Sequence, residues 1–225
     1  MAKTDNKADK TKEWRKIVRK RMYKATKEEA VGRYRTPFPP FNYRWEHVQT
    51  VVKLAVRLAE LTGADVEVVE AAAWLHDVAK YNAKQKHPQK GAEQARKILP
   101  KTDFPPEKIE RVAKAIEVHM GLWRKEPLAN LEAAVLWDAD KLTKIGLTGV
   151  FHWLGDSLSQ GRSLEMVEIL ELGHTANWQE RTVASMHTEP ARKAAAERLR
   201  RYRALWHELE EEVHGHDLGG GSRKL

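Results

Sequence analysis

The chain contains no cysteine among its 225 residues. This absence excludes disulfide bonds, thiolate zinc sites and thiol catalysis, so any bound metal must be held by His, Asp and Glu. No apolar run approaches the roughly 20 residues that a transmembrane helix needs. The leading residues, Met-Ala-Lys-Thr-Asp, are polar and unlike a secretory signal, so we expect a cytoplasmic protein without a membrane span.

Strand signals are absent too, because no segment alternates apolar and polar residues and no tight hairpin sequence occurs. Apolar residues instead recur at helical spacing, and Gly63 stands where a helix C-cap belongs. The hydrophobic content of 41% suffices for a sizeable core, so we predict an all-α chain without internal repeats. The core helices are expected over residues 45–62, 66–80, 87–99, 105–119, 128–145, 147–159, 163–171 and 189–213, the last being long.

The net charge of +8 comes entirely from the leading segment, since residues 1–35 hold 13 Lys and Arg against 5 Asp and Glu. We predict a basic N-terminal extension over residues 1–38, disordered at 1–12, helical at 13–30 and closed by a proline-rich linker. A solvated extension is the plainer interpretation, and nucleic-acid binding through this arm is the alternative. The core domain is expected over 39–216 and a flexible Gly-rich tail over 217–225.

Polar residues interrupt apolar helical stretches at three places. His76 and Asp77 are adjacent and close the segment Ala-Trp-Leu-His-Asp-Val-Ala-Lys; His47 lies upstream, and Asp140 lies downstream in Asp-Ala-Asp-Lys-Leu. Because buried charges need partners, two imidazoles and two carboxylates on such stretches suit a divalent cation. The alternative to a metal site is that these are four unrelated polar residues at helix ends.

The order His47, His76-Asp77, Asp140 resembles the signature of the HD superfamily of metal-dependent phosphohydrolases over roughly residues 40–150. Leu-His-Asp-Val-Ala-Lys and Ala-Asp-Lys-Leu are similar to the family's motifs. The resemblance implies an HD-domain helical bundle over 39–216 with those four residues as metal ligands. It also selects Asp140 over Asp138, which lies about 200° away around the helix and is expected in a supporting or capping role.

Two further histidines, His87 and His119, resemble the extra ligands of dinuclear HD enzymes such as diadenosine tetraphosphate hydrolases. In that reading they bind a second ion and Asp77 bridges the two. Alternatively, His87 is a surface residue that precedes a proline at the start of a helix, and His119 is a histidine at a helix C-terminus, where the helix dipole favours positive charge. The site then holds one or two divalent ions, and the ligand types suit Mn, Fe, Co, Ni, Zn or Mg.

Three residues are candidates for catalytic work. Lys80 and Arg44 each lie one helical turn from a predicted ligand and carry charges that suit a phosphate, although each could pair with a carboxylate instead. His119 is a candidate general acid if no second metal binds. We interpret Lys141 and Lys144 as solvating the metal helix, and the eight tryptophans mainly as core residues.

We therefore hypothesise a phosphohydrolase that cleaves a phosphoester or phosphoanhydride, in a nucleotide or dinucleoside polyphosphate, with metal-activated water. Cyclic dinucleotides are disfavoured because the Gly-Tyr-Pro element of the enzymes that cleave them is missing. One alternative is a non-catalytic HD-fold module that binds a nucleotide or nucleic acid, and another is a di-iron oxygenase. A homodimer is left open.

Overall fold

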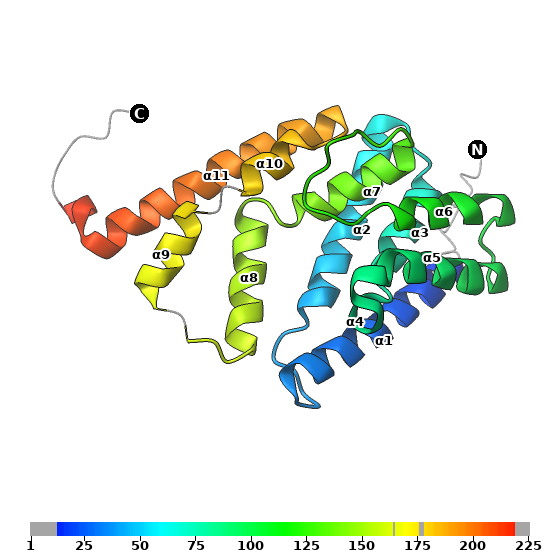
Figure 1. Cartoon of the computed structure of the whole chain (residues 1–225), viewed down its shortest axis with the longest axis horizontal. Coiled ribbons are helices and arrows are strands. Elements are labelled where there is room, and N and C mark those ends of the chain that lie inside the picture. Colours follow the sequence, from blue (N-terminus) through cyan, green and yellow to red (C-terminus); the bar gives the residue numbers. More distant parts are fainter. Residues whose placement is uncertain (1–12, 164, 176–177, 219–225) are drawn as a thin grey trace, which may run out of the picture.

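The computed structural model describes residues 13–163, 165–175 and 178–218, and in these ranges it contains helices and turns but no strand (Figure 1). The α-helices are α1 (Glu13–Tyr34), α2 (Tyr43–Thr62), α3 (Val66–Leu75), α4 (Lys80–Ala83), α5 (His87–Ile98), α6 (Ile109–Glu117), α7 (Leu131–Leu142), α8 (Leu147–Ser159), α9 (Met166–Thr175), α10 (Trp178–Ala184) and α11 (Glu189–His214). Short 3₁₀ turns span Lys84–Lys86, Leu99–Lys101, Pro106–Lys108 and His216–Leu218. The all-α prediction is confirmed.

Helix ends follow the local signals. Asn42 and Asp65 cap α2 and α3 through their side chains, and Gly63 ends α2 in the left-handed region at φ 76°. The stretch expected as one helix over 66–80 divides after Leu75, where the chain turns through the His-Asp pair before α4 begins. Helix α10 was not expected from the sequence. The predicted disorder of residues 1–12 and most of the predicted tail lie outside the described residues.

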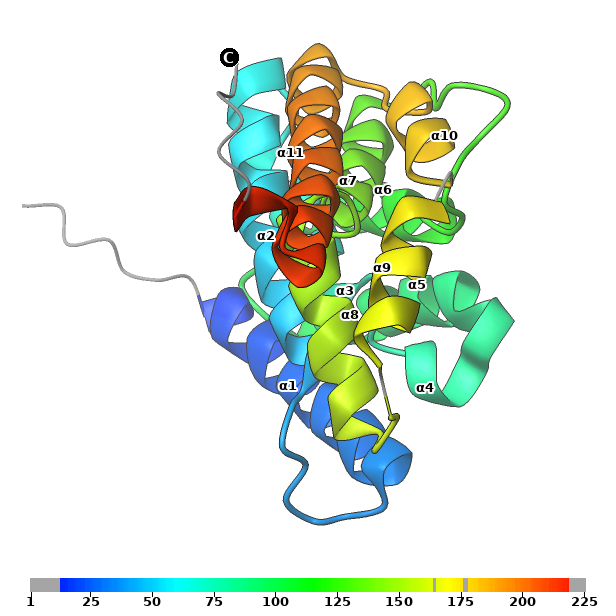
Figure 2. The same ribbon diagram turned by 90° about the vertical axis from the view of Figure 1, so that its left-hand side faces the viewer.

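Helices α2, α3, α5, α6 and α7 pack together around the main core, and α1 lies along α2 and α3 (Figures 1 and 2). Trp14, Val18 and Met22 of α1 are fully buried in that core. Asp103, from the loop before α6, accepts hydrogen bonds from the backbone N–H groups of Glu13 and Trp14 at 3.0 and 2.6 Å. Helix α1 is therefore fastened at its first turn and buried along its apolar face.

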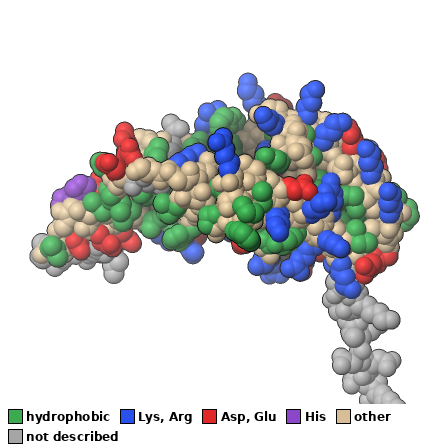
Figure 3. Space-filling view, turned by 90° about the horizontal axis from the view of Figure 1, so that it is seen from below, with side chains coloured by type: hydrophobic (Ala, Val, Ile, Leu, Met, Phe, Trp, Pro, Cys, Tyr) green, Lys and Arg blue, Asp and Glu red, His purple; other side chains and the backbone are tan. Residues whose placement is uncertain are grey.

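A second, smaller core lies between α8, α9 and α11, where Val150, Leu170, Tyr202 and Trp206 are buried. These helices form an arm that extends away from the main bundle (Figure 1). Lys and Arg side chains gather over the bundle half of the face shown in Figure 3, while the arm exposes more hydrophobic and acidic side chains. Within the described ranges, no helix is both long and apolar enough to cross a membrane.

The start of helix α11 is hydrogen-bonded to a carboxylate on α7. Asp138 is fully buried and accepts hydrogen bonds from the backbone N–H groups of His187 and Thr188 at 2.9 and 2.7 Å. It also accepts one from the Thr188 hydroxyl at 2.7 Å. Negative charge at a helix N-terminus is favoured by the helix dipole. Asp138 therefore joins the main bundle to the start of the C-terminal helix.

Candidate metal centre

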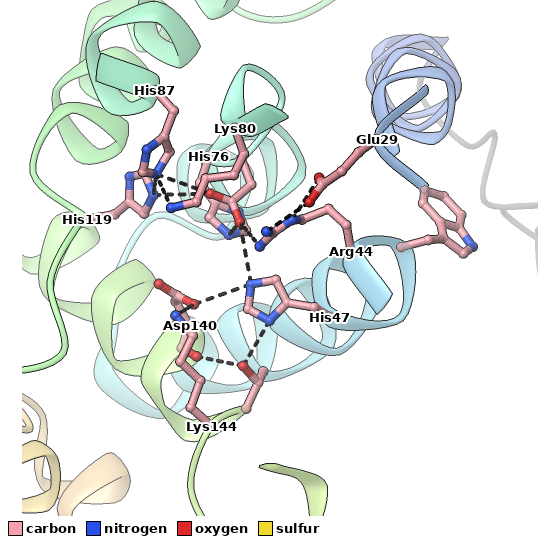
Figure 4. Close-up of polar contacts among 12 residues, drawn as sticks. Glu29, Arg44, His47, His76, Lys80, His87, His119, Asp140 and Lys144 are labelled. Carbon is pink, nitrogen blue, oxygen red and sulfur yellow. Dashed lines mark hydrogen bonds and ion pairs between the residues drawn. The ribbon is translucent and has the colours of Figure 1, made fainter. Parts of the chain in front are cut away.

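Six side chains that the sequence singles out as ligands converge on one buried point (Figure 4). They come from α2, the turn after α3, the start of α5, the turn after α6, and α7, and each is at most 6% exposed. The residues are His47, His76, Asp77, His87, His119 and Asp140. Packing of α2, α3, α6 and α7 about the shared core brings these distant positions together.

Each of the four imidazoles has one ring nitrogen fixed by an oxygen acceptor. The Nδ1 atoms of His76, His87 and His119 donate to the carbonyls of Ala73, Lys84 and Ile116, each three residues earlier, at 2.8, 2.5 and 2.6 Å. With Nδ1 protonated, each Nε2 presents a lone pair toward the centre. Such partners orient metal-binding histidines and set their tautomer.

His47 reaches the same state through a hydroxyl. Its Nδ1 lies 3.0 Å from Thr143 Oγ1, and the Thr143 hydroxyl proton is donated to the Asp140 carbonyl at 2.7 Å. The hydroxyl oxygen must therefore accept from His47, which leaves Nε2 unprotonated. Thr143 was not predicted from the sequence. Its only signal is its position three residues after Asp140.

Asp77 faces both halves of the cluster. One carboxylate oxygen, Oδ2, lies 3.7 and 3.6 Å from the Nε2 atoms of His47 and His76. The other, Oδ1, lies 3.3 and 3.6 Å from the Nε2 atoms of His87 and His119. This division is the arrangement a carboxylate needs to bridge two ions.

The centre of the cluster is short of proton donors. The Nε2 atoms of His47 and His76 are buried without a hydrogen-bond partner among the described residues, and Asp140 Oδ1 lies 3.3 Å from His47 Nε2 and 3.2 Å from Lys144 Nζ. The Nε2 atoms of His87 and His119 face each other at 3.1 Å. Two lone pairs at that distance repel unless a cation or a proton lies near them. The donor set therefore fits divalent metal binding.

Donor atoms of His47, His76 and Asp140 lie within 4.8 Å of one another, and so do those of His76, Asp77 and His119. Burial lowers the pKa of His47 well below its ordinary value and the pKa of His76 to about 4, despite nearby carboxylates. Burial also lowers the pKa of His119. These imidazoles are neutral at pH 7, as metal ligation requires.

The cationic residues around the cluster hold both aspartates ionised. Burial raises the pKa of Asp77, but its polar neighbours, the Arg44 guanidinium foremost among them, outweigh burial and keep that pKa well below 3.8. The Arg44 guanidinium donates to Asp77 Oδ2 at 2.7 Å and to the buried Glu29 carboxylate at 3.1 Å. Arg44 is thus held by two carboxylates beside the cluster. Lys80 Nζ donates to His87 Nε2 at 3.3 Å.

The interpretation of Lys141 as a solvated residue was wrong. Lys141 is 1% exposed, forms an ion pair with Asp140 Oδ2 and donates to the His119 carbonyl at 2.9 Å. Burial lowers its pKa to about 8, although Asp140 opposes the shift. Lys144 Nζ lies 3.2 Å from Asp140 Oδ1. These two lysines outweigh burial and keep the pKa of Asp140 well below 3.8.

The cluster opens into a cavity of about 300 Å³. Its wall carries Asp77, Asp140, His87 and His119 of the cluster. Four cationic side chains also line it: Arg44, Lys80, Lys141 and Lys144. Tyr43 also lines it and stacks on His47 with ring centroids 6.0 Å apart.

Asp138, two residues before Asp140, does not face this cluster. It points toward the start of α11, which supports the capping role expected for it.

Replacing Thr143 by valine should weaken metal binding about 10- to 100-fold, the usual cost of losing an outer partner of a metal-binding histidine. Valine keeps the side-chain shape but removes the acceptor of the His47 proton. Titration of metal-free protein with Mn²⁺ measures the change. Thr143→Ser, which restores a hydroxyl, serves as the control and should recover most of the affinity. Equal affinities for the valine and serine variants would contradict this role.

Residues 44–145 match the family model of the HD domain, so the HD resemblance covers this part of the chain. Among proteins of known sequence, the uncharacterized protein YpgQ of Bacillus subtilis (strain 168) is 27% identical over 180 residues, which cover 77% of this chain and 85% of YpgQ. The family-model match over residues 44–145 confirms the HD resemblance that the His47, His76-Asp77 and Asp140 pattern indicated.

Solved structures show the same fold. The crystal structure of YpgQ superposes with a TM-score of 0.64 at 21% identity and covers 89% of this chain and 95% of YpgQ. YpgQ in complex with ADP gives a TM-score of 0.58 at 23% identity, with 84% and 97% covered. An HD-superfamily hydrolase from Bacillus thuringiensis gives 0.61 at 18% identity, with 89% and 98% covered.

Proposed function

We propose that the chain is a metal-dependent phosphohydrolase that cleaves a phosphoester or phosphoanhydride bond of a nucleotide. The observation that carries the proposal is the division of Asp77, with one oxygen toward His47 and His76 and the other toward His87 and His119. When bound, divalent ions in such a site supply an acidified water and stabilise charge on phosphate oxygens. YpgQ, which shares the fold, has been crystallised with ADP.

The residues divide into two groups of donors about Asp77. His47, His76 and Asp140 would hold one ion, His87 and His119 would hold a second, and Asp77 would contact both. Their Nδ1 partners keep each imidazole turned inward, so the protein is preorganised before metal arrives. His119 is assigned to the second ion, and its role as a general acid is the alternative if that ion does not bind.

The cations lining the cavity orient the phosphate. Arg44 and Lys80 lie beside Asp77 and His87, and their charges face the same cavity as the metal-binding atoms. Positive groups held at fixed positions in a partly buried site stabilise the charge that develops on phosphate oxygens. Glu29 fixes Arg44 from behind, which limits the reorganisation of the guanidinium when a substrate arrives. Arg44 and Lys80 are therefore assigned to phosphate stabilisation.

The test is a panel of mono-, di- and triphosphates of nucleosides and of dinucleoside polyphosphates, assayed with added Mn²⁺ after metal removal. We expect hydrolysis that is absent without metal and restored on adding it. Binding of a nucleotide without turnover at any metal concentration would instead support a non-catalytic HD-fold module. Oxygen consumption together with a mixed-valence iron signal would support a di-iron oxygenase.

A further inference from the structure

A second cavity of about 210 Å³ opens between α8, α9, α10 and α11, at the base of the arm. Aromatic rings dominate its wall, which includes Trp153, Trp178, Tyr202 and Trp206. Two glycines in its wall allow close packing that a side chain would prevent. A Cβ on Gly173 would lie 2.2 Å from the Trp206 ring, and one on Gly149 would lie 2.4 Å from the Lys144 carbonyl oxygen.

Two polar groups in this aromatic wall, Gln179 Oε1 and Trp206 Nε1, have no hydrogen-bond partner within the described residues. Gln179 is 3% exposed and lines the cavity, and its Oε1 makes no hydrogen bond within the described residues. A buried amide left unpaired costs free energy, so a ligand that hydrogen-bonds to it is favoured. Mostly apolar cavities with a small number of convergent polar groups are typical of small-molecule sites.

Lys144 is shared by the walls of the two cavities. It lines both of them, and its ammonium lies 3.2 Å from Asp140 Oδ1. A ligand with its phosphates at the metal-binding residues would therefore pass Lys144 before reaching the tryptophans. The aromatic cavity is smaller than the roughly 300 Å³ at which whole-ligand pockets begin, so it suits one ring system.

We propose that this aromatic cavity is the nucleobase pocket of the substrate and that Gln179 reads the hydrogen-bonding edge of the base. The proposal rests on the proposed function, and it narrows the substrate to phosphates that carry an aromatic, hydrogen-bonding base. Bases stack on aromatic side chains and are read along their polar edges by such amides. A purely apolar group would leave Gln179 Oε1 unpaired.

The experiment compares a substrate with a base to one without. Gln179→Met keeps the side-chain length but removes the amide, and Gln94→Met on α5, which lines neither cavity, is the matched control. With Mn²⁺ present, the KM for ATP should rise about 10- to 100-fold in Gln179→Met, as expected when a buried hydrogen bond to a ligand is lost. Turnover of tripolyphosphate and bound metal should match wild type in both variants.

Adenosine provides a readout that does not depend on hydrolysis. Its binding should quench tryptophan fluorescence in wild type and Gln94→Met, and the affinity should fall by a similar factor in Gln179→Met. If wild type hydrolyses neither ATP nor tripolyphosphate yet binds adenosine through Gln179, the proposed function fails and the base pocket stands. If both substrates are hydrolysed while Gln179→Met leaves the KM for ATP and adenosine binding unchanged, the base pocket is overturned.

Discussion

Replacing Asp77 by alanine should remove bound metal and abolish hydrolysis. Asp77 supplies an oxygen to each half of the cluster, at 3.3 to 3.7 Å from the four imidazole Nε2 atoms. Losing only an outer partner of a ligand costs 10- to 100-fold in affinity, so losing this carboxylate should cost more than about 100-fold in affinity and in kcat/KM. Metal content of the purified variant and turnover of the best nucleotide measure both effects.

The control for that variant is Asp217→Ala, which removes an exposed carboxylate outside the cavity. Circular dichroism and unfolding curves must show that both variants are folded. Arg44 keeps the Glu29 carboxylate as a partner when Asp77 is lost, so the variant does not leave an isolated buried charge. A folded Asp77→Ala protein with the metal content and turnover of wild type would remove the basis of the proposed function.

Alanine substitutions of Asp138 and Asp140, which are two residues apart, should have different effects, one on stability and the other on metal binding. Asp138→Ala removes the acceptor of three hydrogen bonds at the start of α11 and should lower the free energy of unfolding by on the order of 4 kcal/mol. Metal content of the folded fraction should stay at the wild-type value. Asp140→Ala should instead lose metal, because Asp140 shares a donor group with His47 and His76.

Urea unfolding of metal-free protein measures the first effect, and metal titration measures the second. Both variants delete a buried carboxylate from the same helix, so each serves as the control for the other. If Asp138→Ala lost metal while its unfolding free energy stayed unchanged, the assignment of Asp140 as ligand and Asp138 as helix anchor would be reversed.

The sequence predicted that these six side chains come together, because their pattern is unusual. Adjacent His76 and Asp77 at the end of an apolar helix need partners, and the family resemblance connected them to His47 and Asp140. The helices that contain those two residues could also be predicted from apolar spacing, and Gly63 indicated the end of the helix that contains His47. The break after Leu75 was not predicted, because the turn through His76 and Asp77 depends on tertiary contacts rather than on a glycine or proline.

The side chains that surround these six residues could not be predicted from the sequence. Thr143 and Lys141 look like ordinary helix residues, and only the packed structure shows that one accepts from His47 and the other is buried against Asp140. Glu29 lies in a segment whose sequence indicated a basic extension, yet it holds Arg44. The tryptophans read as core, whereas Trp153 and Trp178 line a cavity that forms only when four helices meet.

The HD family match stops at residue 145, but Asp138 inside it finds its hydrogen-bond donors only at residues 187 and 188. Cutting the chain after the match would remove the hydrogen-bond partners of the Asp138 carboxyl and would uncover the surface of α7 on which α11 packs. The matched residues 44–145 are therefore not a self-contained unit in this chain. Grafting them into another protein would require carrying the beginning of α11 along with them.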